Sequence, residues 1–397
     1  MPKTRWLVLA LLFAATTINY LDRLLLSTLS PVLRDEFQFS SALYGNISAA
    51  FQASYALGFL FLGRWLDRVG TKKGLFVAAA VWSTASVLHV TVTNASQFAI
   101  WRALLGFAEG ANFPAAFKAL AEWFPPEERS LATGILNAGV NLASVAGPPL
   151  FVALTAHYGW RFCFFAVSAL GFLWLFAWAS QYQPKSIPAP ASTAVSYREL
   201  FRHRPTWGIV LGKILVDPTW YFLLFWLPLY FRDVHKLDMS QIGWALPFIY
   251  FMSGVGSLIG GWANGRLLKH GWPLQRTRLS GLFLCACIVP VAAYAAMHAT
   301  ALNAVLIFSL AAAAHQAFSS IAFMLPADVF PSSAVGTILG LGGFAGAMSS
   351  VVFSAVLPGY LVPIFGYTPL VVTLTCGYLC AVAVTWKTFG RFQPVPL

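Results

Sequence analysis

Several charged side chains fall inside long apolar stretches of the sequence, where solvation cannot be their role. They are Asp22, Arg23, Arg102, Glu109, Lys118, Lys213 and Asp217. On insertion scales, a charge in the middle of a membrane-spanning helix costs about 2.5–3.5 kcal/mol, so it normally faces a cavity or a partner. An arginine presents a planar fork that fits a carboxylate, and a buried carboxyl group can load and release a proton. These residue types therefore indicate anion binding combined with proton exchange.

The charges of the first half lie in two stretches. In Asn19-Tyr20-Leu21-Asp22-Arg23, Asn19 precedes the two charges by three and four residues, so all three can share one side of a helix. Asp22 and Arg23 could instead neutralise each other, but adjacent side chains point about 100° apart on a helix. Arg102 and Glu109 are seven residues apart, which puts them on one face. Their alternative role is a structural ion pair.

The second half places Lys213, Asp217, Trp220 and Tyr221 on one helical face. The two aromatic rings could stack on a sugar ring or simply pack in the core. Lys213 and Asp217, four residues apart, could contact substrate or form a structural pair.

Other polar residues in apolar stretches have two open interpretations. His315 and Gln316 could form a ligand site or a proton relay, or His315 could be a buried histidine with its hydrogen bonds satisfied. The Tyr55 hydroxyl could bind substrate or belong to the core. Asn137 and Asn141 share a face and could join helices or line a site.

Apolar helices must position these residues. The chain of 397 residues is 58% hydrophobic and 10% charged, with a mean hydropathy of +0.71, which excludes a water-soluble globular protein and a disordered one. Stretches of about 20 apolar residues span a bilayer as helices. We expect such helices at 6–33, 44–62, 74–92, 97–121, 131–155, 160–180, 206–231, 241–263, 279–297, 301–325, 334–362 and 367–387.

The basic residues are distributed unevenly between the predicted loops. With the N-terminus inside, 17 of the 25 lysines and arginines fall in inside segments and four in outside loops. The positive-inside rule then predicts that both termini are cytoplasmic. This bias explains the net charge of +12 without a nucleic-acid partner. The five cysteines lack metal-site spacing, and no nucleophile–base cluster is visible, so we expect no catalytic site, no metal site and no enzyme.

The sequence is internally duplicated. Gly63-Arg-Trp-Leu-Asp67 is echoed by Gly260-Gly-Trp-Ala-Asn264, and Glu122-Trp-Phe-Pro125 by Asp328-Val-Phe-Pro331. We predict a six-helix bundle at 1–180, a cytoplasmic linker at 181–205 and a second six-helix bundle at 206–397. Twelve transmembrane helices in two pseudo-symmetric bundles, with a site near the midplane, describe a secondary transporter.

The loop after the second predicted helix resembles the signature loop of the major facilitator superfamily. It runs Gly63-Arg-Trp-Leu-Asp67-Arg68-Val-Gly70-Thr-Lys72-Lys73. Its physical sense is a cytoplasmic gate: glycine permits close helix contact, aspartate can cap a helix or meet an arginine, and the basic residues hold the loop inside. The alternative is a merely basic loop. The gate residues would be Gly63, Asp67, Arg68, Gly70 and Lys72.

Further motifs resemble the anion:cation symporter family within that superfamily. They are Asn19–Arg23, Glu109-Gly-Ala-Asn112-Phe-Pro114 and Glu122-Trp-Phe-Pro-Pro-Glu-Glu-Arg129. Trp207-Gly-Ile, Asp217-Pro-Thr-Trp220, Trp226-Leu-Pro228 and Ala314–Ser319 look like the bacterial hexuronate transporters.

The resemblance implies import of sugar acids with protons by alternating access. It assigns the proton to Asp22 and Glu109 and the substrate carboxylate to Arg102 and also Arg23, with Tyr20 and Tyr55 at sugar-acid-binding positions. Aldonate-carrying relatives have a glutamine where this chain reads Val140-Asn141, which favours hexuronates such as galacturonate or glucuronate over aldonates. Another organic monocarboxylate is the alternative. A proton-driven drug antiporter is the alternative of another class, and Arg23 and Arg102 argue against it.

The expected setting follows from these assignments. We predict a multi-pass monomer in the bacterial inner membrane. Its partners would be a small organic anion and the lipid bilayer, and its coupling ion H⁺, with no other cofactor.

Overall fold

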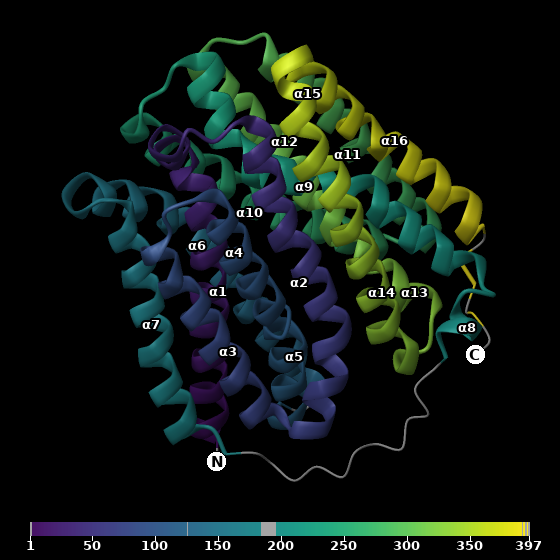
Figure 1. The fold of residues 1–397 in the computed structure, drawn as a ribbon. Coiled ribbons are helices and arrows are strands. Elements are labelled where there is room, and N and C mark those ends of the chain that lie inside the picture. The colour runs from purple at the N-terminus through teal and green to yellow at the C-terminus, as the bar shows by residue number, and fades with distance from the viewer. Residues whose placement is uncertain (1, 125, 184–195, 391, 394, 396–397) are drawn as a thin grey trace. The chain divides into compact units, whose positions relative to one another are not determined.

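The computed structural model describes residues 2–124, 126–183, 196–390, 392–393 and 395 (Figure 1). The structure does not describe a few side chains inside helices, among them those of Arg64, Asp67 and Asn137. Across the described residues every regular element is a helix. All twelve predicted apolar stretches are helical, which confirms the all-α fold class.

The chain divides into two compact units. The first unit comprises 1–189 and 237–247, and the second unit comprises 190–236 and 248–397. Residues 237–247, which include the first nine residues of the helix that begins at Met239, therefore cluster with the first unit, whereas the sequence assigned them to the second bundle.

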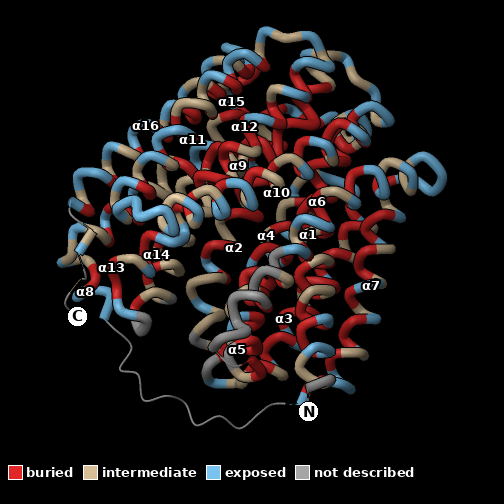
Figure 2. The backbone as a smooth tube through the Cα atoms, turned by 180° about the vertical axis from the view of Figure 1, so that it is seen from behind, coloured by how far each residue is buried: buried red, intermediate tan, exposed pale blue. Residues whose placement is uncertain are grey.

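Helices of the first unit are joined by short connections. They are α1 (Pro2–Phe37), α2 (Ser41–Val69), α3 (Thr71–Leu88), the 3₁₀ turn η1 (His89–Thr91), α4 (Ala95–Glu109), α5 (Asn112–Trp123), α6 (Pro126–Tyr158) and α7 (Trp160–Gln181). The helix α1 packs along α6 and α7, and α2 packs along α4. In Figure 2 the long buried stretches of α1 appear red, as expected for a helix covered by neighbours on several sides.

Helices of the second unit begin inside the predicted linker. They are α8 (Tyr197–Leu200), α9 (Arg204–His235), α10 (Met239–Lys269), α11 (Leu274–Met297), α12 (Ala301–Ala322), α13 (Leu325–Val329), α14 (Ser332–Ser350), the π-helical η2 (Val351–Val356), α15 (Leu357–Phe365) and α16 (Thr368–Phe389). The predicted linker at 181–205 is thus partly helical, and its residues 184–195 lie outside the description.

Ten helical segments of the described chain are long and apolar enough to cross a membrane. Their outer surfaces carry large exposed apolar side chains, such as Phe176, Leu258 and Val291. Lipid tails solvate such side chains, whereas monomeric soluble proteins rarely expose extended apolar surface. The other two predicted spans are α2 and the α4–α5 segment.

The predicted continuous helix at 97–121 is broken, and proline chemistry explains the break. Pro114 has no backbone N–H, and its ring clashes with the carbonyl group four residues earlier, which belongs to Gly110. The helix α4 ends at Glu109, and α5 begins at Asn112. Two polar side chains that the sequence singled out therefore stand on either side of a helix break.

A second proline shapes the π-helical segment. Pro358 cannot donate to the carbonyl oxygen of Ser354, which lies four residues earlier. The indole Nε1 of Trp226 donates to that oxygen instead, at 2.8 Å. A π-helical turn is thus held by a side chain of α9, and it replaces the uninterrupted α-helix predicted for 334–362.

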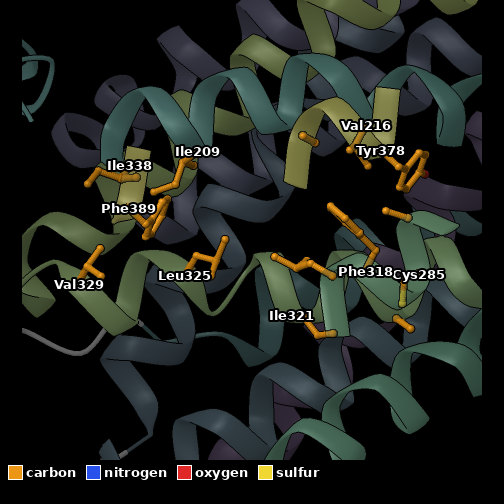
Figure 3. Packing of buried hydrophobic residues seen from close by; sticks show 14 of the residues in the cluster. Ile209, Val216, Cys285, Phe318, Ile321, Leu325, Val329, Ile338, Tyr378 and Phe389 are labelled. Atoms are coloured by element: carbon orange, nitrogen blue, oxygen red, sulfur yellow. The ribbon is translucent and has the colours of Figure 1, made fainter. Parts of the chain in front are cut away.

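The core of the second unit is apolar and lies between α9, α11, α12, α14 and α16. Figure 3 shows Ile209 and Val216 of α9 facing Phe318, Ile321 and Leu325. Some of these side chains line a pocket together with the charged residues of α9 described below.

Candidate functional site

The first unit buries an ion pair between two helices. Arg23 Nη2 of α1 lies 3.2 Å from Glu109 Oε2 at the end of α4, and the two side chains are 3% and 0% exposed. The sequence paired Glu109 by face with Arg102, which lies in its own helix. The structure instead gives it the arginine of α1 as partner.

Asp22 and Arg102 sit next to this pair. Ser86 Oγ of α3 donates a hydrogen bond to Asp22 Oδ1. Arg102 Nη1 donates to the backbone oxygen of Asp22 at 3.2 Å, and its Nη2 donates to that of Arg23 at 3.5 Å. Arg102 thus holds the backbone of α1 at the two charged residues. Of the two arginines, Arg23 is the one whose guanidinium meets a carboxylate.

Aromatic rings enclose the Arg23 guanidinium. Its Cζ lies 4.6 Å from the ring centre of Tyr20, 4.3 Å from that of Tyr55 and 5.4 Å from that of Phe51. Cation–π attraction favours the charged arginine at such distances. The predicted residues Tyr20, Arg23 and Tyr55 therefore lie together, and Phe51 joins them.

Close packing of α2 on α4 brings Tyr55 and Phe51 to this site. A Cβ atom at Gly58 would overlap the carbonyl group of Phe107, and one at Gly106 would overlap that of Phe51. Glycines at both points let the two backbones approach, as in other membrane helix pairs.

The second unit carries a less buried ion pair. Lys213 Nζ lies 2.9 Å from Asp217 Oδ1, with side chains 22% and 16% exposed. The ammonium also lies 4.7 Å from the ring centre of Phe323. Lys213 and Asp217 line a largely apolar pocket together with Ile209, Phe318 and Leu325, which Figure 3 labels.

One turn further along α9 lies an aromatic and histidine cluster. Trp220 stacks on His315 with ring centres 5.0 Å apart and planes within 4°. The Nδ1 atom of His315 shares a hydrogen bond with the Tyr378 hydroxyl. Trp220 also meets the ring of Tyr250 edge-on at 6.3 Å. The predicted Trp220 and His315 are thus brought together, and Tyr378 and Tyr250 extend the group.

Three predicted residues lie outside these clusters. Tyr221 stacks on Phe225 of its own helix at 6.0 Å. Gln316 is half-buried on α12, and Asn141 is exposed on α6. Their part in a site remains a prediction.

The segment predicted as a gate loop is almost entirely helical: residues 63–69 belong to α2 and 71–73 to α3, so Gly70 alone connects the two helices. Gly70 has φ +83°, a conformation that glycine adopts without strain, and it ends α2 and starts α3. Lys118 Nζ donates to the backbone oxygen of Leu66 at 3.1 Å, and Trp178 Nε1 donates to that of Lys72 at 3.0 Å. The side chain of Asp67 lies outside those described, Gly63 is on α2, and Arg68 is exposed.

Glu122, near the end of α5, connects the start of α3 to the residue that follows α7. Glu122 accepts hydrogen bonds from Thr71 Oγ1 at 2.6 Å and from the Tyr182 hydroxyl. Burial and the Glu122 carboxylate both raise the pKa of Tyr182, so the hydroxyl keeps its proton and remains the donor. In the second unit, Arg278 donates two hydrogen bonds to the Asp328 carboxylate, from Nε at 2.8 Å and from Nη2 at 3.1 Å.

Sequence reasoning missed Ser86, Phe51, Tyr378 and Tyr182 as members of these groups. Each is a single residue in an apolar or loop stretch, and no spacing marks it. Throughout the described chain, no group of three histidine, cysteine or carboxylate side chains could hold a metal ion.

Comparisons with known proteins agree with this architecture. The sequence profile of the Major Facilitator Superfamily matches residues 12–354. The chain is 28% identical to the hexuronate transporter of Escherichia coli (strain K12), over 96% of this chain and 93% of the relative. It is 27% identical to the D-galactonate transporter of Escherichia coli O6:H1, over 96% and 94%.

A solved structure shares the fold. It is the crystal structure of a bacterial homologue of the human lysosomal transporter Spinster, inward-facing and occupied. The TM-score is 0.79 at 18% identity, and the match covers 98% of each chain. With a profile match over most of its length and this fold, the chain is a multi-pass membrane protein that belongs to the Major Facilitator Superfamily, a family of transporters and not of enzymes.

Proposed function

We propose that this protein is a proton-coupled importer of a sugar-acid anion, with a hexuronate such as galacturonate or glucuronate as substrate. The buried Arg23–Glu109 pair is the observation that carries this function. An arginine already neutralised by a carboxylate cannot hold a second anion equally well, so the substrate carboxylate competes with Glu109 for Arg23.

Protonation of Glu109 resolves this competition. A proton on Glu109 removes its negative charge and frees the Arg23 fork for the substrate carboxylate. When the substrate leaves, an unpaired Arg23 buried away from water is costly, which favours loss of the proton and return of the ion pair. One cycle then carries substrate and proton in the same direction. Asp22, beside Arg102, is the second proton candidate.

Aromatic side chains suit a sugar-acid substrate. The rings of Tyr20 and Tyr55 already enclose Arg23, so a sugar acid whose carboxylate reaches Arg23 meets apolar faces and hydroxyl groups together. In the second unit, Trp220 and His315 offer a flat surface and hydrogen-bonding groups. Alternating access of the two units, both termini in the cytoplasm, a bacterial inner membrane and a monomeric state belong to the same proposal.

An aldonate is the second candidate substrate. The similarity to a D-galactonate transporter, nearly equal to that with a hexuronate transporter, favours it. The two classes differ in ring closure, which is a feature that aromatic stacking would distinguish.

Transport by purified protein in proteoliposomes tests the function. We expect an inward proton gradient to drive accumulation of galacturonate or glucuronate above the external concentration, with weaker transport of D-galactonate and none of benzoate. Thermal shift with the same panel should follow this order, because a bound ligand stabilises by mass action. Hexuronate accumulation that does not depend on the proton gradient would contradict the proton coupling. A preference for benzoate would contradict the substrate class.

A further inference from the structure

Asn19 is a fully buried amide whose hydrogen bonds are not made by the described protein atoms. Its exposed fraction is 0%, and neither its Nδ2 nor its Oδ1 has a partner within the described chain. Buried polar groups in native proteins nearly always have a partner, from the protein or from ordered water. The position of Asn19 therefore calls for a bound group that is not part of the chain.

Two contacts fix where the Asn19 side chain lies. Thr16, three residues earlier, receives a hydrogen bond from Asn112 Nδ2 at 3.2 Å, and Arg23, four residues later, meets Glu109 at 3.2 Å. Residues three and four apart share a side of the helix. Asn19 thus faces the break between α4 and α5, between the two contacts.

The atoms across from Asn19 also lack partners. Glu109 Oε1 and Asn112 Oδ1 are buried and have no hydrogen-bond partner among the described residues. Together with Asn19 they offer one amide nitrogen that donates and three oxygens that accept when Glu109 is ionised. Only a molecule that both donates and accepts satisfies this set. A water accepts from Asn19 Nδ2 and donates to Glu109 Oε1 and to one of the amide oxygens, which gives the total of about three hydrogen bonds that is typical of buried waters.

A second carboxyl group lies on the other side of Asn19. Asp22 is three residues further along α1, and its Oδ2 is likewise buried without a partner in the described part of the chain. By helical spacing, Asn19 lies on the side of α1 between Asp22 and Arg23, the partner of Glu109, and thus between the residues that lead to the two proton candidates of the proposed function.

We propose that Asn19 holds a water that connects Asp22 to Glu109, and that Asn19 is a positioning residue for proton transfer between them. The water site is inferred from the structure alone, and only its role in transport rests on the proposed function. In the transfer, protonated Asp22 gives its proton to the water as the water gives one of its own to the Glu109 carboxylate. The O–H bond of Asp22 breaks as one forms at the water oxygen, and another O–H bond of the water breaks as one forms at Glu109, so the water is regenerated.

Three variants isolate the amide. Asn19→Leu has nearly the same size but removes both polar atoms, and Asn19→Ser keeps a group that can hold water. Thr28→Val is the matched control, because Thr28 lies on the same helix, is 0% exposed and has an Oγ1 without a partner among the described atoms. Asn19→Val serves in place of Asn19→Leu if the latter is not monodisperse.

Infrared spectroscopy measures the relay without any transported substrate. The carboxylic-acid C=O band that Glu109→Gln removes is followed after transfer of purified protein into D₂O. We expect Asn19→Leu to slow its deuterium shift at least ten-fold, whereas Asn19→Ser and Thr28→Val keep the wild-type rate. A wild-type rate in Asn19→Leu would overturn the proposal.

Transport assays distinguish the water relay from a substrate-binding role of Asn19 and from a failure of the proposed function. We expect Asn19→Leu to slow proton-driven galacturonate uptake at least ten-fold and to keep substrate affinity within two-fold. A ten-fold loss of galacturonate affinity at an unchanged exchange rate would show that Asn19 binds a substrate hydroxyl, which overturns the water site. If wild-type protein lacks proton-driven uptake while Asn19→Leu still slows deuterium exchange, the relay stands and the proposed function fails.

Discussion

Each unit contains an ion pair with aromatic rings nearby, yet the pairs differ in burial. In the first unit, Arg23 and Glu109 are 3% and 0% exposed and come from different helices. In the second unit, Lys213 and Asp217 are 22% and 16% exposed and lie one turn apart on α9. Removing one member of a fully buried pair leaves an uncompensated charge, whereas a partly exposed pair is screened.

This difference suggests a division of labour. In the proposed mechanism, the charge state of Glu109 in the first unit decides what Arg23 binds. The second unit offers stacked rings and a pocket whose polar groups are few, which suits recognition of shape. Variants in the two units should therefore fail in different ways.

Loss of the Arg23 guanidinium should have the largest effect. Truncating one partner of a buried hydrogen-bonded charge pair costs about 2–5 kcal/mol, so Arg23→Ala should weaken hexuronate binding at least about 30-fold. Arg23→Lys keeps the charge but loses the fork, and we expect a smaller yet clear loss. Calorimetry on folded protein measures both, and wild-type affinity in Arg23→Ala would remove Arg23 from the site.

Arg102→Lys tests which of the two arginines binds the substrate carboxylate. The sequence placed Arg102 first for the substrate carboxylate, but its terminal nitrogens hold the backbone oxygens of Asp22 and Arg23. We expect Arg102→Lys to weaken binding less than Arg23→Lys. The reverse order in the same calorimetric series would return the carboxylate to Arg102.

The helix ends of the two units should differ in stability. Asp328 is held by two bonds from Arg278, and Glu122 by the neutral hydroxyls of Thr71 and Tyr182. Hydrogen bonds to charged groups are worth about 1.5–3 kcal/mol each. Arg278→Ala breaks two of them and removes the counter-charge of Asp328, whereas Thr71→Val removes only one of the two bonds to Glu122. Thermal unfolding in detergent should therefore show a larger loss of Tm for Arg278→Ala than for Thr71→Val, and equal losses would erase this contrast.

Recognition in the second unit should depend on ring stacking. Trp220→Ala removes the surface that stacks on His315, and an aromatic contact of this kind is worth about 0.5–1.5 kcal/mol beyond its area. We expect affinity for galacturonate to fall roughly ten-fold, with proton coupling intact and Trp220→Phe between the two. Normal transport by Trp220→Ala would make the ring a packing element.

The Lys213–Asp217 pair should give the smallest effect. Because both side chains are partly exposed, we expect Lys213→Met to change hexuronate affinity less than about five-fold. A loss as large as that of Arg23→Ala would place a second carboxylate ligand in the second unit.

Periodicity and charge predicted most of the fold, because apolar stretches of bilayer length allow little besides helices. The helix break at Gly110 could have been predicted from the sequence, because Pro114 follows Gly110 by four residues. The partner of Glu109 was not, because spacing along one helix says nothing about which residue of another helix lies opposite. Ser86 and Phe51 gave no signal for the same reason: a lone residue acquires its role only when two helices pack.

Glu109→Gln tests the central claim, that this carboxyl couples proton movement to transport. Glutamine imitates the protonated side chain in shape and hydrogen bonding but cannot release a proton. In proteoliposomes we predict that the variant keeps substrate counterflow and loses accumulation driven by an inward proton gradient. Gradient-driven accumulation at the wild-type level would contradict the account, reduce Glu109 to a structural partner of Arg23, and pass the proton to Asp22 or His315.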